Sequence, residues 1–226
     1  MIKTFLILII FTNFLHSSQQ IIVVVSPNFN SSKAKLSCYE DDKKVFDTID
    51  VNLGTKGLGW GLGEFKLKQK ENEPTKKEGD KKAPAGVFKL TSTFGYAKNE
   101  NFDLKYAHLS KKLICVDDSN SKHYNKIIEM PKKRPNSFEQ MRRDDDQYRL
   151  GVVVLHNKKQ KKQAGSCIFL HVQKSKNAST AGCTSMTINQ MRGINSWLDG
   201  SKNPILIQVP KSSLNEIKEL FPTLPL

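Results

Sequence analysis

Two residues in the last third of the chain have types and spacing that could do chemistry. Cys183 follows Thr180-Ala181-Gly182, and His171 lies twelve residues before it, within SCIFLHVQKSKNASTAGCTSM (166–186). A cysteine sulfur can attack a carbonyl carbon, and an imidazole within reach can take the thiol proton and pass it on. The pair therefore indicates a nucleophile with its base.

The elements expected around the pair would bring both side chains to one place. Residues 167–172 alternate as a strand, with His171 at its end on the face opposite the apolar residues. The clearest helix is predicted over 187–198, with Thr187 as its N-cap. Because a helix N-terminus carries positive charge, we expect the pKa of Cys183 to be lowered toward the thiolate.

The residues around Cys183 suggest how a transition state could be held. Gly182 permits an unusual backbone angle and a close approach by substrate. Backbone amides beside Cys183 could face a developing oxyanion. Since no acidic residue lies between 159 and 198, a backbone carbonyl is expected to orient His171.

Spacing alone leaves other interpretations open. Cys183 could be a buried small hydrophobe. His156, at the end of the preceding strand, could contribute to the cleft or lie on the surface at a hairpin. A metal shared by Cys167 and His171 is disfavoured, because four residues along a strand separate them by roughly 13 Å.

The rest of the chain predicts a single mainly β domain with few helices. Expected strands cover 21–25, 34–38, 45–51, 84–93, 148–156, 167–172 and 205–209, and expected helices cover 187–198 and 212–220. The charged segment 66–82 is predicted to be a mobile loop or flap. Residues 95–147 are predicted to be irregular, because they are polar and contain two prolines.

The N-terminus has the layout of a secretory signal peptide over residues 1–19. Lys3 is followed by an apolar run from Phe5 to Leu15 and by two serines near a cleavage point. The run is short for a membrane span. We therefore expect export to the periplasm or cell envelope, with residues 20–226 as the catalytic domain.

The charge of the chain is strongly positive, at +14 with a pI near 9.6. Only five of its 36 basic residues are arginine, whereas base and phosphate recognition favours arginine. We expect a lysine-rich surface suited to an anionic cell-envelope surface, no nucleic-acid partner, and a monomer.

The four cysteines limit the possible crosslinks. No CxxC pair is present, so a structural zinc site is not expected. If Cys183 is a nucleophile, at most one disulfide forms among Cys38, Cys115 and Cys167, and Cys115 with Cys167 is one possible pair. Three consecutive carboxylates at 144–146 cannot all face one calcium ion, so a solvated turn is expected there.

Four ordered motifs resemble one family. The segment 166–186 is similar to the signature of the L,D-transpeptidase (YkuD-type) family, in which a histidine precedes Ser/Thr-x-Gly-Cys. KKEGDKKAPAGVFKL (76–90) resembles that family's Gly-Asp and Pro-x-Gly-x-Phe segment, and 115–125 and 141–157 resemble one bacterial branch. Together these motifs cover roughly residues 45–210.

The resemblance implies a mixed β fold, sandwich- or barrel-like, without a cofactor or metal. It implies that Cys183 attacks the carbonyl of diaminopimelate in a peptidoglycan tetrapeptide stem and releases D-alanine. The acyl group would pass to an amine on a second stem, or to water in an L,D-carboxypeptidase. His171 would move the proton, Gly182 and neighbouring amides would bind the oxyanion, and Thr180 occupies the Ser/Thr position.

Two positions depart from the family's commoner motif. Ala181 stands where a second histidine is usual, and Ser185 stands where arginine or asparagine is frequent. With Thr180, Gly182 and His156 they complete the candidate oxyanion and substrate-binding residues. The departures leave acceptor choice open, and a basic wall-binding module with a decayed site remains a third hypothesis.

Overall fold

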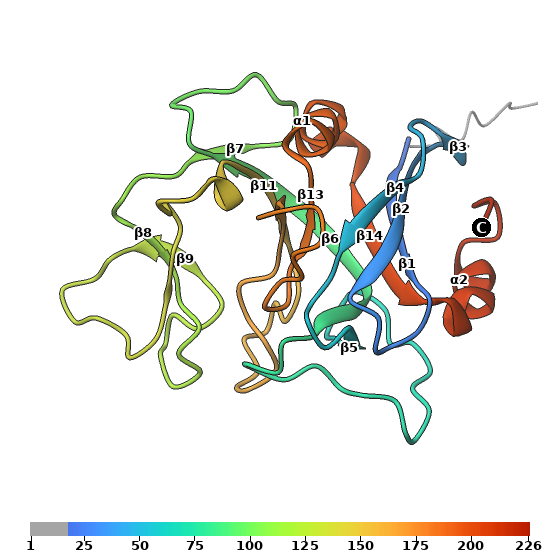
Figure 1. Cartoon of the computed structure of the whole chain (residues 1–226), viewed down its shortest axis with the longest axis horizontal. Coiled ribbons are helices and arrows are strands. Elements are labelled where there is room, and N and C mark those ends of the chain that lie inside the picture. The colour runs from blue at the N-terminus through green and yellow to red at the C-terminus, as the bar shows by residue number, and fades with distance from the viewer. Residues whose placement is uncertain (1–17) are drawn as a thin grey trace, which may run out of the picture.

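One large curved sheet organises the described chain, residues 18–226, in this computed structural model (Figure 1). The strands follow the order β1 (Gln20–Ser26), β14 (Ile205–Pro210), β6 (Ala83–Gly95), β11 (Leu150–Val154), β12 (Phe169–Val172), β13 (Thr184–Met186), β4 (Ile49–Asn52), β2 (Lys33–Glu40) and β3 (Lys43–Lys44). Strands β5 (Leu58–Trp60) and β7 (Tyr106–His108) pair with β6. Because β1 also pairs with β2, the path closes into a barrel-like ring, which confirms the expected mainly β fold.

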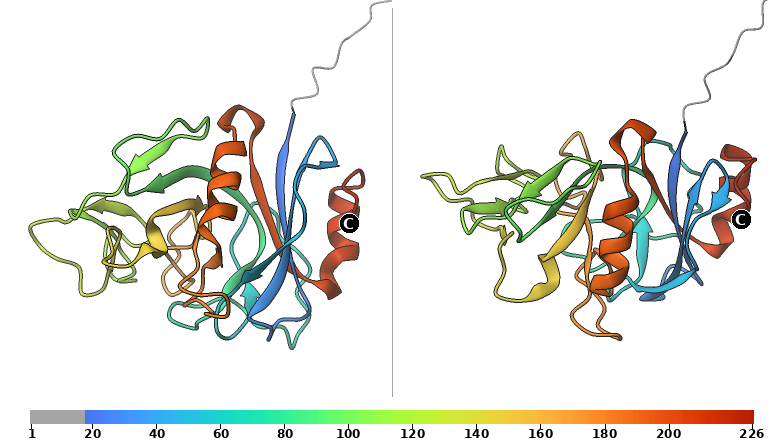
Figure 2. Two further views of the ribbon diagram at one scale, coloured as in Figure 1. Left: turned by 45° about the horizontal axis from the view of Figure 1, so that its top comes forward. Right: turned by 90° about the horizontal axis from the view of Figure 1, so that it is seen from above.

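A second, three-stranded sheet lies beside the first. It consists of β8 (Leu113–Cys115), β9 (Ile127–Glu129) and β10 (Glu139–Gln140). We call residues 113–140 the small lobe, and the three views show it projecting to one side of the main sheet (Figures 1 and 2). These short strands, with β7, were not expected in a segment predicted to be irregular.

Two helices complete the fold, α1 (Ile188–Trp197) and α2 (Leu214–Leu220), with 3-10 turns η1 (Asp146–Tyr148), η2 (Gly200–Lys202) and η3 (Lys211–Ser213). The predicted cap of α1 is confirmed, because the Thr187 side chain accepts a hydrogen bond from the backbone of Gln190 in a reciprocal capping box. Helix α1 packs on β11 and β12. No helix of the described part is long and apolar enough to cross a membrane.

Alternate side chains of β12 belong to two different hydrophobic clusters, as the predicted alternation requires. Ile168, Leu170 and Val172 belong to the main core, whereas Cys167 and Phe169 belong to a second cluster. That second cluster also contains Cys183 and residues of the small lobe. The face of β12 that carries His171 is therefore buried as well, beneath the lobe.

Several predicted boundaries shift in the structure. The strand expected at 45–51 begins only at Ile49, because Val45 and Phe46 are exposed. The helix expected from residue 212 begins at Leu214, after η3. The predicted signal peptide lies outside the described residues except for residues 18 and 19.

The prediction of a mobile loop or flap over residues 66–82 is wrong for the second half of that segment. The backbone N–H of Lys76 donates to the Trp60 carbonyl at 2.9 Å, and that of Glu78 donates to the Gln163 carbonyl at the same distance. The side chain of Lys76 is only 4% exposed. Hydrogen bonds to strand β5 and to the loop after β11 hold this part of the segment against the sheet.

Candidate active site

Cys183 and His171 line one cavity of about 310 Å³ between the main sheet and the small lobe. Strand β12 pairs in parallel with β13, with Leu170 opposite Thr184, so Cys183 enters β13 beside the strand that carries His171. The Phe169 N–H donates to the Cys183 sulfur at 3.3 Å. Parallel pairing of two short strands therefore brings the two predicted residues together.

The imidazole of His171 has a defined tautomer. Its Nδ1 lies 2.8 Å from the carbonyl oxygen of Val172. Because a carbonyl only accepts hydrogen bonds, Nδ1 carries the hydrogen and Nε2 keeps its lone pair. The backbone carbonyl predicted to orient this histidine is confirmed, and the Tyr148 ring packs edge-on against the imidazole with centroids 5.4 Å apart.

Burial sets the charge state of the pair. It raises the pKa of the Cys183 thiol to about 12, and the negative charge of Glu139 adds to the increase. Burial likewise lowers the pKa of His171 to about 4. At neutral pH the resting pair is therefore a thiol beside a neutral imidazole.

The prediction of a lowered Cys183 pKa is wrong. Strand β13 separates Cys183 from α1, and four extended residues span roughly 13 Å. The influence of a helix dipole fades within about the first turn. Cys183 is thus too far from the helix to be ionised by it, and desolvation dominates.

The loop before Cys183 is fixed by the hydroxyl of Thr180. Its Oγ1 donates to the Cys183 carbonyl at 2.6 Å and accepts from the Gly182 N–H at 3.1 Å. Because the Gly182 N–H already donates to Thr180, an oxyanion would have to accept hydrogen bonds from neighbouring amides. Gly182 has φ +155°, and an added Cβ would lie 3.0 Å from the Lys82 carbonyl oxygen, so close backbone approach does require glycine here.

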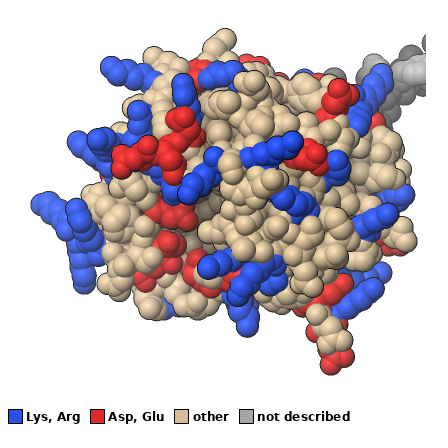
Figure 3. Space-filling model, viewed as in Figure 1, with Lys and Arg blue, Asp and Glu red and all other residues tan. Residues whose placement is uncertain are grey.

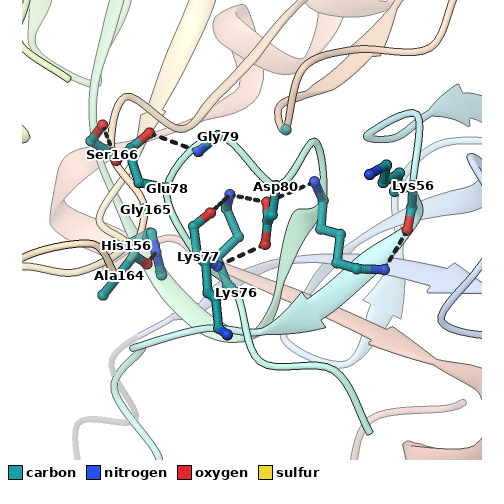
Figure 4. A network of polar contacts seen from close by, with 12 residues as sticks. Lys56, Lys76, Lys77, Glu78, Gly79, Asp80, His156, Ala164, Gly165 and Ser166 are labelled. Carbon is teal, nitrogen blue, oxygen red and sulfur yellow. Dashed lines mark hydrogen bonds and ion pairs between the residues drawn. The ribbon is translucent and has the colours of Figure 1, made fainter. Parts of the chain in front are cut away.

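Lys76, Glu78 and Gly79 line the cavity. Asp80 holds together the charged segment 76–82 that carries them (Figure 4). One Asp80 oxygen accepts from the Lys76 ammonium at 2.5 Å and from the Lys82 N–H at 2.9 Å. The other accepts from the Lys77 N–H at 2.7 Å. A single aspartate thus folds the loop and presents the Lys82 carbonyl to Gly182.

Two candidate residues lie elsewhere than expected. Ser185 is buried on β13, opposite Asn52 of β4, and does not line the cavity. His156 is also absent from the cavity wall and is only 1% exposed. Ala181 lies on the cavity rim with an exposed side chain.

The structure corrects both interpretations of His156. Its Nδ1 accepts from the Leu62 N–H at 3.2 Å, and its Nε2 lies 2.9 Å from the Ala164 carbonyl. Its ring also packs edge-on against Phe88. The turn after β11 folds inward over this ring, so His156 joins loops instead of lining the cleft or facing solvent.

Sequence reasoning missed the polar groups that the small lobe and the segment following it, through η1, add to the cavity. They include Asp117, Glu139, Arg143 and Tyr148. The Tyr148 hydroxyl donates to Glu139 Oε2 at 2.6 Å. Asp117, Arg143 and Tyr148 lie in motifs of the family resemblance and Glu139 lies outside them, but no spacing in the sequence connects any of the four with Cys183.

The disulfide Cys115–Cys167 is formed, with Cα atoms 6.0 Å apart. It attaches β8 of the small lobe to the chain two residues before β12, and the Cys167 carbonyl lies 3.5 Å from the Cys183 sulfur. Cys38 is free and buried, and burial raises its pKa to about 12. The possible pairing named from the sequence is therefore confirmed.

The described residues, 18–226, hold no group of three or more His, Cys, Asp and Glu side chains placed to bind a metal ion. The acidic run at 144–146 instead caps η1, where Asp145 accepts from the Gln147 N–H and pairs with Arg143. This arrangement agrees with the expected solvated turn.

The comparisons with known proteins agree with this geometry. The family of L,D-transpeptidase catalytic domains (YkuD) matches residues 19–207. No curated protein and no solved structure matches the chain. Since the match covers most of the chain, this protein belongs to the L,D-transpeptidase catalytic-domain family, whose cysteine-dependent enzymes act on peptidoglycan.

Proposed function

We propose that this protein is an exported L,D-transpeptidase that acts on peptidoglycan tetrapeptide stems through an acyl-enzyme on Cys183. The observation that carries the proposal is the pairing of a buried thiol with a neutral imidazole in one polar cavity. The His171 tautomer leaves Nε2 ready to accept a proton. Family membership supplies the substrate class.

The neutral pair defines how acylation proceeds. His171 Nε2 takes the thiol proton as sulfur attacks the stem carbonyl, so the thiolate forms only when the bond forms. The amides of Ala181 and Cys183 stabilise the oxyanion, since the Thr180 and Gly182 amides already donate to Leu53 and Thr180. His171 then protonates the departing D-alanine amine, and the carbonyl remains on Cys183 as a thioester.

Export and a monomeric state belong to the same proposal. Peptidoglycan lies outside the cytoplasmic membrane, and a structural disulfide is typical of oxidising compartments. Lysine and arginine side chains spread over the face shown in Figure 3 favour binding to an anionic envelope surface.

An L,D-carboxypeptidase remains the second candidate. The departure at Ala181 favours it, because Ala181 lines the cavity at a position where the family commonly carries a histidine. In that case water would replace the amine acceptor, and the products would be tripeptides.

The test uses purified protein, disaccharide tetrapeptide and intact-mass spectrometry. A covalent adduct should form on Cys183 with the tetrapeptide and with a carbapenem. Cys183→Ala should abolish it, and His171→Gln should slow turnover by roughly 100- to 10,000-fold. Cys38→Ala is the matched control, because it removes the other free thiol from the core. Absence of any adduct on folded wild-type protein would refute the enzyme and leave the decayed wall-binding module.

A further inference from the structure

We propose that Glu139 is a second acid–base group of this site, which binds the ammonium group of an amine acceptor and removes its proton before attack on the thioester. The proposal rests on the proposed function, since only a transpeptidase uses an amine as its second substrate. It assigns to the small lobe the role of receiving that substrate.

The fold places Glu139 at the nucleophile through a short chain of contacts. Glu139 lies on β10 directly opposite Cys115 of β8. Cys115 is disulfide-bonded to Cys167, whose carbonyl oxygen contacts the Cys183 sulfur. The disulfide therefore fixes the carboxylate on the cavity wall that faces Cys183 and His171.

The protein leaves acceptor atoms here without donors. Oε2 of Glu139 accepts from the Tyr148 hydroxyl, while Oε1 has no hydrogen-bond partner within residues 18–226. Oδ1 of Asp117, in the same cavity, is buried and equally unpartnered in that part of the chain. A buried carboxylate oxygen without a donor, such as Oδ1 of Asp117, is costly, and a ligand that brings N–H groups and positive charge would satisfy it together with the open Oε1 of Glu139.

The nearby cations are already engaged. Arg143 makes a two-pronged contact with Asp145, both at 2.9 Å. Lys76 donates to Asp80 and to the Lys77 carbonyl. Neither therefore makes a direct ion pair with Glu139.

The charge around Glu139 is negative although the protein is basic. In Figure 3 acidic side chains run along the boundary between the small lobe and the main sheet. Burial raises the pKa of Glu139, and the charges of Asp117 and Glu78 raise it further, against the Tyr148 hydrogen bond and the charge of Arg143. Such a carboxylate attracts a cation and is a stronger base than an exposed glutamate.

The step balances as follows. The carboxylate of Glu139 takes one proton from the acceptor ammonium, which leaves a neutral amine. The amine attacks the thioester carbon, a C–N bond forms, and the C–S bond breaks with its electron pair remaining on Cys183. The second amine proton passes through His171 Nε2 to that sulfur, and Glu139 releases its own proton to water.

The experiment measures how the acyl-enzyme partitions between amine and water. Disaccharide tetrapeptide serves as donor and acceptor, and mass spectrometry gives the ratio of crosslinked dimer to tripeptide. Glu139→Gln keeps an acceptor for the Tyr148 hydroxyl but removes the charge, so the ratio should fall at least about tenfold. Glu129→Gln makes the same change at an exposed site on β9 and should leave the ratio unchanged.

Two further arms separate chemistry from folding. Glu139→Asp retains the carboxylate and should keep part of the transfer, while Asp117→Asn should raise the KM for the acceptor. Hydroxylamine is largely uncharged at neutral pH, so its capture of the acyl group should be much less sensitive to Glu139→Gln than transfer to the tetrapeptide.

The outcomes distinguish this inference from the proposed function. Absence of acyl-enzyme in the wild type would refute the proposed function itself. Acyl-enzyme that yields only tripeptide would overturn the acceptor site and support the carboxypeptidase. An unchanged ratio in folded Glu139→Gln protein would overturn the role of Glu139 alone.

Discussion

The charge state of Cys183 provides the sharpest test of the reasoning from burial. The pKa of this thiol is raised from 9.0 to about 12. That difference corresponds to about 1000-fold less thiolate at neutral pH and to roughly 4 kcal/mol against ionisation. We therefore expect almost no thiolate on Cys183 in the folded protein below about pH 10.

Thiolate absorbs in the ultraviolet, so a pH titration measures this equilibrium directly. The difference between Cys38→Ala protein and Cys38→Ala/Cys183→Ala protein isolates Cys183 and cancels the tyrosines. The folded difference signal should stay flat from pH 6 to pH 9 and rise only above it. The same titration in denaturant should reach half its amplitude near the unperturbed thiol pKa of 9.0.

A full thiolate signal at pH 7 would refute the argument. It would mean that Cys183 and His171 rest as an ion pair, and that the histidine pKa is raised instead of lowered. Acylation would then begin from a preformed thiolate, and general-base removal of the thiol proton would have no role.

Three further outcomes follow from the site. Replacing Cys115 and Cys167 by serine should lower the free energy of unfolding by about 4 kcal/mol, since the crosslink closes a loop of 52 residues; denaturant titration checks this. Gly182→Ala should abolish acylation with the fold retained, by circular dichroism and adduct mass, because its φ of +155° strains an L side chain. His156 and His171 have pKa values near 4 in the folded protein, below the unfolded value of 6.5. Their burial as neutral rings therefore contributes to the free energy of unfolding above pH 6.5, and about 3 kcal/mol of it should be lost for each histidine as the pH drops to 4. Denaturant midpoints that coincide at pH 7 and pH 4.5 would contradict this.

Local patterns predicted the elements whose signals are local. The alternation over 167–172, the Thr187 cap and the apolar stripe of α1 depend on neighbours a few residues apart, and the structure confirms them. The meeting of Cys183 and His171 at one cavity was likewise predicted, because both residues lie on one short segment that forms two adjacent strands.

The errors arise where distant segments decide the environment. The sequence placed His156 in the cleft or on the surface at a hairpin, yet the turn that follows it folds inward and buries it. The charged run 66–82 reads as a solvated flap, yet Asp80 gathers its second half into a wall of the cavity. The Cys183 pKa was predicted from a nearby helix, whereas burial under the small lobe determines it.

The sequence by itself indicated a cysteine and a histidine suited to act as nucleophile and base, a mainly β domain and the family's ordered motifs. Those properties depend on residue type and on spacing along one segment. Only the tertiary structure decided that the pair is neutral and that Glu139 faces Cys183. The physical reason is that desolvation and through-space charge depend on which distant segments cover a group, here through a disulfide that joins residues 52 positions apart.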